Sequence, residues 1–326
     1  MQVISIGQTA LPHSRELYFA GAACEFETSS SELVRLLERL STPANASRSG
    51  RFSMRVAVDE LSSEPAGTPH FRGLHHVVIA SFGSANVFVF DILRRRLSAT
   101  VSGTLARDYR FWKEKLIPIA HGVLGAAMGL VPVHCACLES EGEGLLIAGM
   151  SGAGKSTLSV ALAEGGFNYV SDDWTYISRH DDCLLAHGTS APVKLLPDAV
   201  KHFQNLQEHS LQISMNGELA YEVDIADVFH AQVERNCEPR WLIFLERMQR
   251  RGGEFVPMSS AETRSYLDSC IERLPRQLSE AAAMREQTIE SVALLPCWCL
   301  QYGGSPQFAA NLLWEFVAER RAEVCA

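Results

Sequence analysis

The feature that most constrains the fold is a glycine-rich segment near the middle of the chain. Residues 149–157 read Gly-Met-Ser-Gly-Ala-Gly-Lys-Ser-Thr, which matches the pattern GxxxxGK[ST]. In this pattern the glycines let the backbone curl, so that successive amide N–H groups point at phosphate oxygens. A helix that begins at the lysine adds the partial positive charge of its N-terminus. The segment therefore predicts a loop that binds the phosphates of a nucleoside triphosphate.

The segments on either side of this loop have the order that such a loop requires. Residues 144–148 are short and apolar and lie between glycines, as is typical of a buried strand. Residues 155–164 carry apolar side chains at helical spacing, and Gly165 and Gly166 supply a stop signal. Strand, loop and helix follow one another, so we predict a nucleotide-binding α/β domain.

The whole loop is expected to contact ATP. The residues concerned are Gly149, Ser151, Gly152, Ala153, Gly154, Lys155, Ser156 and Thr157. Lys155 would reach the β- and γ-phosphates, and the hydroxyl of Ser156 would bind Mg²⁺. ATP and Mg²⁺ are therefore the predicted cofactors.

Length and composition exclude several classes of protein. The chain has 326 residues, enough for two domains, and no run of 18 uncharged apolar residues that would predict a membrane span. Its first residues lack the basic start and apolar core of a secretory signal. A net charge of −9 gives little support for a nucleic-acid partner, and nine scattered cysteines fit a reducing compartment. We expect a cytoplasmic protein with no nucleic-acid or membrane partner, and the sequence leaves open whether it forms a homo-oligomer.

Two stretches are locally basic in spite of the negative net charge. They are residues 94–96 and residues 247–251. The simplest interpretation of each is a solvated face or loop. The alternative is a docking patch for an acidic or phosphorylated substrate. Lys194 and Arg247 are further candidates for a phosphate contact.

The first part of the chain, residues 1–110, is predicted to be an α+β module separate from the ATP-binding domain of residues 111–326. A serine cap opens an amphipathic helix over residues 31–40, and a loop rich in Ser, Pro and Asn follows at residues 41–49. The predicted strands of this module are residues 17–28, 52–58, 76–81, 86–91 and 97–102.

The rest of the chain alternates between strand and helix patterns. Residues 106–130 have helical periodicity that is interrupted by Pro118, Gly122 and Gly125. The predicted strands that follow are residues 131–138, 144–148, 167–171, 174–178, 183–187, 240–245 and 295–302, and the predicted helices are residues 155–164, 259–273 and 306–320.

Two adjacent carboxylates, Asp172 and Asp173, end the strand predicted about seventeen residues after Lys155. One carboxylate can hold the metal while the other accepts a proton from an attacking hydroxyl. Adjacent residues on a strand point to opposite faces, so the pair can divide these roles only if the strand ends there. His134 lies near the middle of the strand predicted over residues 131–138, where a single histidine is more often a core residue than a functional one.

The order of these motifs resembles the catalytic domain of the HPr kinase/phosphorylase family, whose fold is related to phosphoenolpyruvate carboxykinase rather than to the common nucleotide kinases. The matching features are the strand with His134, a hairpin, a loop of the form GxSGxGKS at residues 149–156, and a strand that ends in Asp172 and Asp173. The resemblance covers roughly residues 115–320 and is most specific over residues 131–177. It implies an α/β fold in which a carboxykinase-like catalytic domain with a phosphate loop follows the N-terminal α+β module.

The resemblance also implies a role for each of these residues. His134 would be the active-site histidine near the metal and the substrate phosphate. Lys155 and Ser156 would contact the phosphates and Mg²⁺. Asp172 would be the general base, and Asp173 would be a carboxylate of the metal site.

The sequence departs from the family's pattern in two places. The family's second signature is a glutamate followed by an Arg-Gly-rich stretch. It has no counterpart after Asp173, where residues 186–194 stand instead. This difference argues against phosphorylase activity. The N-terminal module does not look like the one usual in the family, so the protein HPr is not the expected acceptor. The chain looks more like the related kinases that act on other acceptors, including those of peptide-modification clusters such as lasso-peptide clusters.

The predicted function is an ATP- and Mg²⁺-dependent kinase that transfers the γ-phosphoryl group to a hydroxyl, with the serine of a protein or peptide as the expected acceptor. A first alternative keeps the fold and changes the acceptor to a small-molecule alcohol. A second alternative is a non-catalytic module that senses a nucleotide and uses residues 1–110 for an interaction. The combination of His134, Asp172 and Asp173 argues against the second alternative, because binding alone needs no proton acceptor.

Overall fold

The computed structural model describes residues 10–41, 49–180, 183–189, 191–214, 217–269 and 278–324. The chain divides into two compact units. The first comprises Met1–Pro132, Tyr176–Asp182 and Glu272–Thr288, and the second comprises Val133–Thr175, Cys183–Ile271 and Ile289–Ala326. The first unit extends past residue 110, and the division into two domains at that point stays a prediction.

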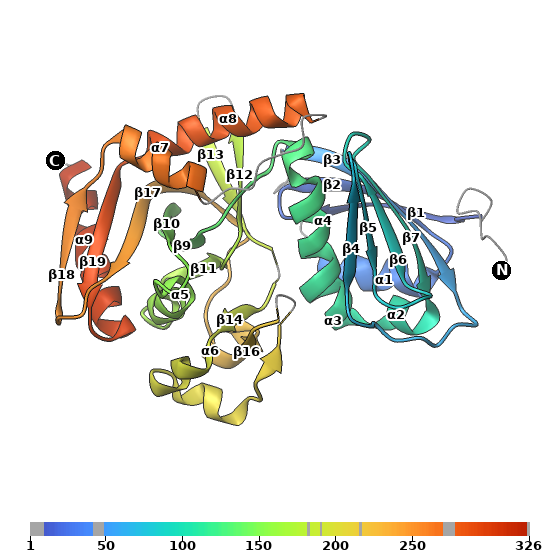
Figure 1. Cartoon of the computed structure of the whole chain (residues 1–326), viewed down its shortest axis with the longest axis horizontal. Helices are drawn as coiled ribbons and strands as arrows, with labels where there is room; N and C mark the ends of the chain where they lie inside the picture. The colour runs from blue at the N-terminus through green and yellow to red at the C-terminus, as the bar shows by residue number, and fades with distance from the viewer. Residues whose placement is uncertain are drawn as a thin grey trace. The chain divides into compact units, whose positions relative to one another are not determined.

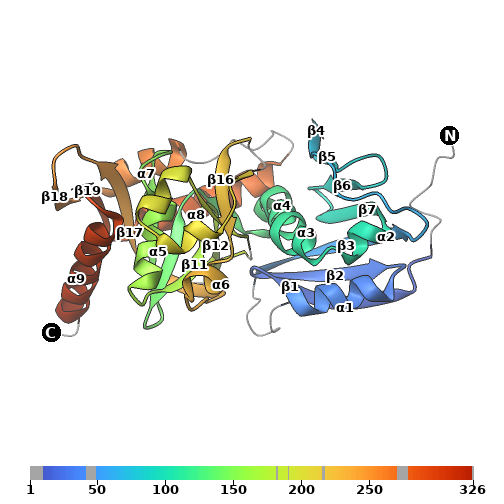
Figure 2. The same ribbon diagram turned by 90° about the horizontal axis from the view of Figure 1, so that it is seen from below.

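The first unit is built on a seven-stranded sheet with the strand order β1-β2-β3-β7-β6-β5-β4 (Figure 1). The strands are β1 (His13–Phe19), β2 (Ala22–Thr28), β3 (Ser49–Asp59), β4 (His70–Leu74), β5 (Val77–Ser81), β6 (Val87–Asp91) and β7 (Arg96–Ser102). β2, β3 and β7 are parallel, and the remaining neighbours are antiparallel. Helix α1 (Ser31–Leu40) connects β2 to β3 and lies along β1 and β2 (Figure 2).

Local signals explain the start of this unit. The predicted strand over residues 17–28 is wrong as a single strand, because Ala20 and Gly21 have φ values of 40° and 82° and form a tight turn between β1 and β2. Helix α1 has the predicted bounds. Its Ser30 hydroxyl accepts a hydrogen bond from the Leu33 amide at 3.4 Å, as expected of a serine cap.

The helical stretch predicted over residues 106–130 forms several pieces, which are α2 (Gly103–Arg107), α3 (Tyr109–Phe111), a π-helical turn (Trp112–Leu116), α4 (Ile117–Leu124) and a 3₁₀ turn (Gly125–Met128). Phe111 and Trp112 fix this stretch to the sheet, because their rings make edge contacts with Phe82 and Phe88 of the unit's core. Most of β8 (Val131–Val133) and most of β12 (Thr175–His180) also belong to the first unit.

The second unit contains the phosphate-loop motif on a mixed sheet. Strand β10 (Glu143–Gly149) pairs parallel to β17 (Asn236–Arg247), and β17 pairs parallel to β19 (Cys297–Gly303). Antiparallel strands extend this core: β9 (Ala136–Ser140) beside β10, β11 (Asn168–Ser171) beside β9, and β18 (Gly252–Pro257) beside β19. The carboxyl ends of the three parallel strands therefore meet at one edge of the sheet.

The other elements of this unit are β13 (Cys183–His187), which pairs with the start of β17, and a small sheet of β14 (Val193–Leu195), β16 (Leu219–Val223) and β15 (Gln212–Ile213). The helices are α5 (Lys155–Glu164), α6 (Ile225–Phe229), α7 (Ser260–Ser269), α8 (Ser279–Ala293), which belongs here from Ile289 onwards, and α9 (Pro306–Val324). No helix in the described ranges is long and apolar enough to cross a membrane.

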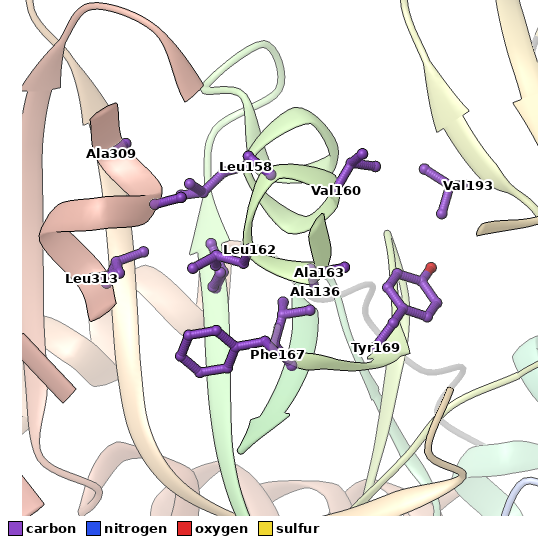
Figure 3. Packing of buried hydrophobic residues seen from close by; sticks show 14 of the residues in the cluster. Ala136, Leu158, Val160, Leu162, Ala163, Phe167, Tyr169, Val193, Ala309 and Leu313 are labelled. Atoms are coloured by element: carbon purple, nitrogen blue, oxygen red, sulfur yellow. The ribbon is translucent and has the colours of Figure 1, made fainter. Parts of the chain in front are cut away.

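The core of the second unit surrounds α5 (Figure 3). Leu158 and Leu162 face α9, whose Ala309 and Leu313 lie opposite, and Val160 points toward Val193 of the small sheet. All six side chains are buried. The helix that follows the phosphate loop is thus buried against both α9 and the small sheet, which fixes its N-terminal end.

Replacing Leu162 by alanine is expected to lower the free energy of unfolding by about 3 kcal/mol, because the side chain is fully buried and its removal leaves a cavity. Urea unfolding followed by circular dichroism measures the loss. Leu294→Ala is the matched control, since Leu294 is 74% exposed and its truncation should change stability by less than about 0.5 kcal/mol. Equal losses in the two variants would contradict the described packing of α5.

Several strand and helix predictions need correction. The strand predicted over residues 131–138 is broken at His134 and Cys135 into β8 and β9, and the Cys135 amide donates to the Val133 carbonyl at 2.8 Å across this bend. Strands β4, β14, β15 and β18 and helices α6 and α8 were not predicted. The helix predicted over residues 259–273 begins at Ser260, and its last four residues and most of the loop predicted at residues 41–49 lie outside the described residues. The mixed α/β class is confirmed.

Candidate active site

The phosphate-loop motif connects β10 to α5 at the carboxyl edge of the parallel strands. Gly149, Gly152 and Gly154 have φ values of 150°, 81° and 95°, a region that glycine adopts without strain. Space is limited as well. A Cβ at Gly149 would lie 3.1 Å from the Leu245 carbonyl oxygen, and one at Gly154 would lie 2.9 Å from the Tyr302 hydroxyl. Conformation and packing together explain the glycines of the motif.

Tyr302 supports the loop from strand β19, which is separated from β10 by β17. Its ring is buried, and its hydroxyl donates a hydrogen bond to the Ala153 carbonyl at 3.2 Å. Burial raises the pKa of Tyr302, so the hydroxyl stays protonated and able to donate. The sequence did not identify this residue. Its only signal was a tyrosine in the last predicted strand, and nothing local connects that strand to residue 153.

Lys155 is the first residue of α5, and its side chain folds back over the loop. It is only 8% exposed, and its Nζ donates to the Gly149 carbonyl oxygen at 3.0 Å. Its positive charge lowers the pKa values of both Asp172 and Asp173. The lysine and the two carboxylates predicted from the sequence therefore share one electrostatic neighbourhood.

Asp172 follows directly after β11 and has a buried carboxylate. Neither carboxylate oxygen has a hydrogen bond of normal geometry with any described residue. Burial raises the pKa of Asp172 to about 6, with the negative charge of Asp173 acting in the same direction, while the nearby hydroxyl of Ser156 and the charge of Lys155 lower it. Burial is the largest of these effects on the pKa. The carboxylate lies beside the first turn of α5.

Asp173 points to a different partner. Nε2–H of His134 donates to its Oδ1 at 2.7 Å, and the His134 ring stacks on Trp174 with 5.3 Å between centroids. The hydrogen bond to His134 lowers the pKa of Asp173. Asp173 has a φ of 65°, unusual for a residue with a side chain, which shows that the backbone turns sharply here.

The turn after β11 explains how two adjacent aspartates face different groups. The strand ends at Ser171, whose hydroxyl lies 2.6 Å from that of Thr175, and the Thr175 hydroxyl donates to the Cys135 carbonyl at 2.8 Å. These contacts join the two ends of the turn to the bend that carries His134. The predicted condition for divided roles, a strand that ends at the aspartates, is present in the structure.

The structure thus brings Lys155, Ser156, Asp172, Asp173 and His134 together. His134 lies in a bend rather than near the middle of a strand as predicted. Among the other residues of the motif, Ser151 and Gly152 are exposed, Ala153 is buried, and Thr157 is partly buried on the first turn of α5. The catalytic, nucleotide and metal roles of all these residues remain predictions.

Two further candidates from the sequence lie near this group. Lys194 of β14 forms an ion pair with Glu218, and its charge contributes to the lowered pKa of Asp173. The guanidinium carbon of Arg247 lies 4.7 Å from the ring centroid of Tyr302, the tyrosine that supports the loop.

No family model matches the chain. Over 113 residues, 34% of this chain and 30% of the relative, the sequence is 32% identical to the HPr kinase/phosphorylase of Lachnoclostridium phytofermentans, so the chain spans about a third of that protein's length. The alignment with the solved Hpr(Ser) kinase/phosphatase from Coxiella burnetii covers 60% of this chain and 99% of that chain, at 15% sequence identity. Its TM-score is 0.32, which is too low to support a conclusion. The sequence match confirms the resemblance to the HPr kinase/phosphorylase family that the motifs predict.

Proposed function

We propose that the chain is an ATP- and Mg²⁺-dependent kinase that transfers the γ-phosphoryl group of ATP to a hydroxyl, with the serine of a protein or peptide as the acceptor. The observation that carries this proposal is the buried carboxylate of Asp172 beside the phosphate loop, which has no hydrogen bond of normal geometry with any described residue. A buried carboxylate of this kind destabilises the folded protein. Its presence therefore points to a function that requires it. A proton acceptor at the phosphate loop is the function that fits its position.

The residues at the loop are suited to hold ATP and a magnesium ion. The curled backbone of residues 149–154 and the ammonium group of Lys155 would bind the phosphates. The hydroxyl of Ser156 and the carboxylate of Asp173 would hold Mg²⁺, which prefers oxygen ligands and leaves several positions to phosphate oxygens and water. The ion would supply positive charge that offsets the charge on the transferring group.

The two aspartates would then have separate tasks. Asp172 would accept the proton of the acceptor hydroxyl. The hydroxyl oxygen would form a bond to the γ-phosphorus, and the bond from that phosphorus to the bridging oxygen of ADP would break. Asp173 would stay ionised through its hydrogen bond to His134 and so remain available to the metal. Most of the rate acceleration would come from positioning and charge, as in other phosphoryl transfers.

The family resemblance supports a more specific assignment. It favours the phosphoenolpyruvate-carboxykinase-like branch of phosphate-loop folds and a cytoplasmic protein kinase. The relative is named an HPr kinase/phosphorylase, but the match covers only 30% of it. We therefore propose kinase activity without phosphorylase activity, and an acceptor other than HPr, because residues 186–194 replace the family's second signature.

The proposal is tested by incubating the purified full chain with Mg²⁺, ATP labelled in its γ-phosphate and a lysate of the source organism. The expected result is label in a protein or peptide fraction that is acid-stable, as a serine phosphate is, and absent when EDTA removes Mg²⁺. Label confined to small molecules would replace the protein acceptor by an alcohol metabolite. Nucleotide binding without transfer to any fraction would contradict the kinase assignment and favour a nucleotide sensor.

A further inference from the structure

Three arginines lie at the same edge of the sheet as the phosphate loop. Leu245 of β17 pairs with Gly149, so Arg247 lies two residues beyond the strand position that faces the start of the loop. Arg250 and Arg251 follow in the turn between β17 and β18. We call Arg247, Arg250 and Arg251 the arginine cluster.

Contacts with the end of β19 hold this cluster close to the loop. Nη1 of Arg247 donates to the Gly304 carbonyl at 3.3 Å, and its guanidinium lies over the ring of Tyr302. A Cβ at Gly304 would lie 3.9 Å from Cγ of Arg251, so the two arginine side chains flank the same glycine. Because the Tyr302 hydroxyl donates to Ala153, one side chain separates Arg247 from the phosphate loop.

The charge of the cluster is not neutralised by the described part of the chain. All three arginines are exposed, and none forms an ion pair with a described residue. By contrast, Arg240 and Arg321 of the same unit each pair with Glu143. Helix α9 begins at Pro306, just after this site, and adds positive potential at its N-terminus. An uncompensated positive patch next to the phosphate loop is unexpected in a chain with a net charge of −9.

We propose that the arginine cluster binds acidic side chains of the protein or peptide that carries the acceptor hydroxyl, an inference that rests on the proposed kinase function. Guanidinium groups match carboxylates in shape and in hydrogen-bond geometry, and exposed arginines do so without first breaking an internal ion pair. A patch of this sign beside the site raises the local concentration of acidic segments and orients them. The acceptor is therefore a hydroxyl flanked by aspartate or glutamate.

The test compares two fluorescently labelled serine peptides of equal length, one with glutamates around the serine and the other with glutamines. Fluorescence anisotropy measures their binding to the full chain with Mg²⁺ and a non-hydrolysable ATP analogue present. The glutamate peptide should bind roughly tenfold more tightly, an advantage that shrinks as salt is added. In the variant Arg247→Gln/Arg250→Gln/Arg251→Gln the two peptides should bind equally.

A matched control changes the net charge by the same amount elsewhere. Arg35, Arg72 and Arg95 are exposed arginines of the first unit, and their triple replacement by glutamine should keep the preference for the glutamate peptide. Arg250→Gln/Arg251→Gln retains the contact of Arg247 with Tyr302 and should lose most of the preference even if the triple variant folds poorly. The affinity for the ATP analogue should stay within about twofold of wild type in the Arg250→Gln/Arg251→Gln variant and in the control variant.

Three results would overturn the proposal: equal binding of the two peptides by the wild type, equal loss of preference in the control variant, or a loss of analogue affinity that matches the loss of peptide affinity. The last result would assign the cluster to the nucleotide site. Transfer of label from ATP by the wild-type chain is measured separately, so a failure of this inference is distinguishable from a failure of the kinase assignment.

Discussion

Replacing Lys155 by alanine is expected to reduce phosphoryl transfer by on the order of a thousandfold. The lysine is the charged side chain that folds over the phosphate loop, and its amino group has only the Gly149 carbonyl as a hydrogen-bond acceptor among the described residues. In the bound state it would exchange this acceptor for phosphate oxygens at little cost. Both MgATP affinity and turnover should fall, because the lost charge acts on bound and on transferring phosphate alike.

The measurement is the transfer of labelled γ-phosphate at saturating MgATP, together with the dissociation constant of a non-hydrolysable analogue. Lys201→Ala is a suitable control, since Lys201 is exposed at the end of a short 3₁₀ segment and should have turnover close to wild type. Circular dichroism checks that both variants fold. A Lys155→Ala protein with near wild-type turnover would contradict the assignment of the loop.

The curled backbone of residues 149–154 could be predicted because its conformation is favoured by the local sequence. Positive φ at Gly149, Gly152 and Gly154 and the helix that begins at Lys155 are properties of consecutive residues. Helix α1 was predictable for the same reason, since Ser30 caps it from one residue before its start. Local signals of this kind do not depend on how distant parts of the chain pack.

The surroundings of the loop could not be predicted, because they depend on pairings between distant residues. Tyr302 reaches Ala153 only because β19, β17 and β10 are neighbours in the sheet. The ion pair of Lys194 with Glu218 likewise depends on the small sheet, whose short strands give weak patterns.

The surroundings of His134 were predicted only in part. Its neighbourhood with Asp173 follows from the family resemblance, and the 2.7 Å hydrogen bond places the two side chains together. The bend at residues 134 and 135 was missed, because the apolar run from Val131 to Leu138 reads as one continuous strand.

Replacing Asp172 by asparagine is expected to slow transfer strongly and, at the same time, to stabilise the protein in the absence of nucleotide and Mg²⁺. The first effect follows from the loss of the proposed proton acceptor, on the order of a hundredfold to ten-thousandfold in rate. The second follows from burial, because asparagine occupies the same space without a charge. Opposite effects on activity and stability are characteristic of a residue that is retained for function.

The stability effect has a definite pH dependence. The pKa of Asp172 is raised from 3.8 to about 6 in the folded protein, so the folded state binds more protons than the unfolded state between these values. Stability is therefore lost as the pH rises from about 4 to about 6, and the full loss persists above about 6, where it amounts to about 3 kcal/mol at most. The asparagine variant should recover about 2 kcal/mol near neutral pH and almost nothing near pH 4.

Asp173→Asn is the matched control, because the neighbouring carboxyl has a pKa shifted in the opposite direction. Its hydrogen bond to His134 lowers the pKa, so its stabilising contribution is present above the unfolded value and is lost as the pH falls through the folded one. The two variants should therefore change stability in opposite directions near neutral pH, measured by urea unfolding of the protein in EDTA. Equal destabilisation of both would mean that the Asp172 carboxylate is satisfied in the folded protein, and would remove the main support for its role as proton acceptor.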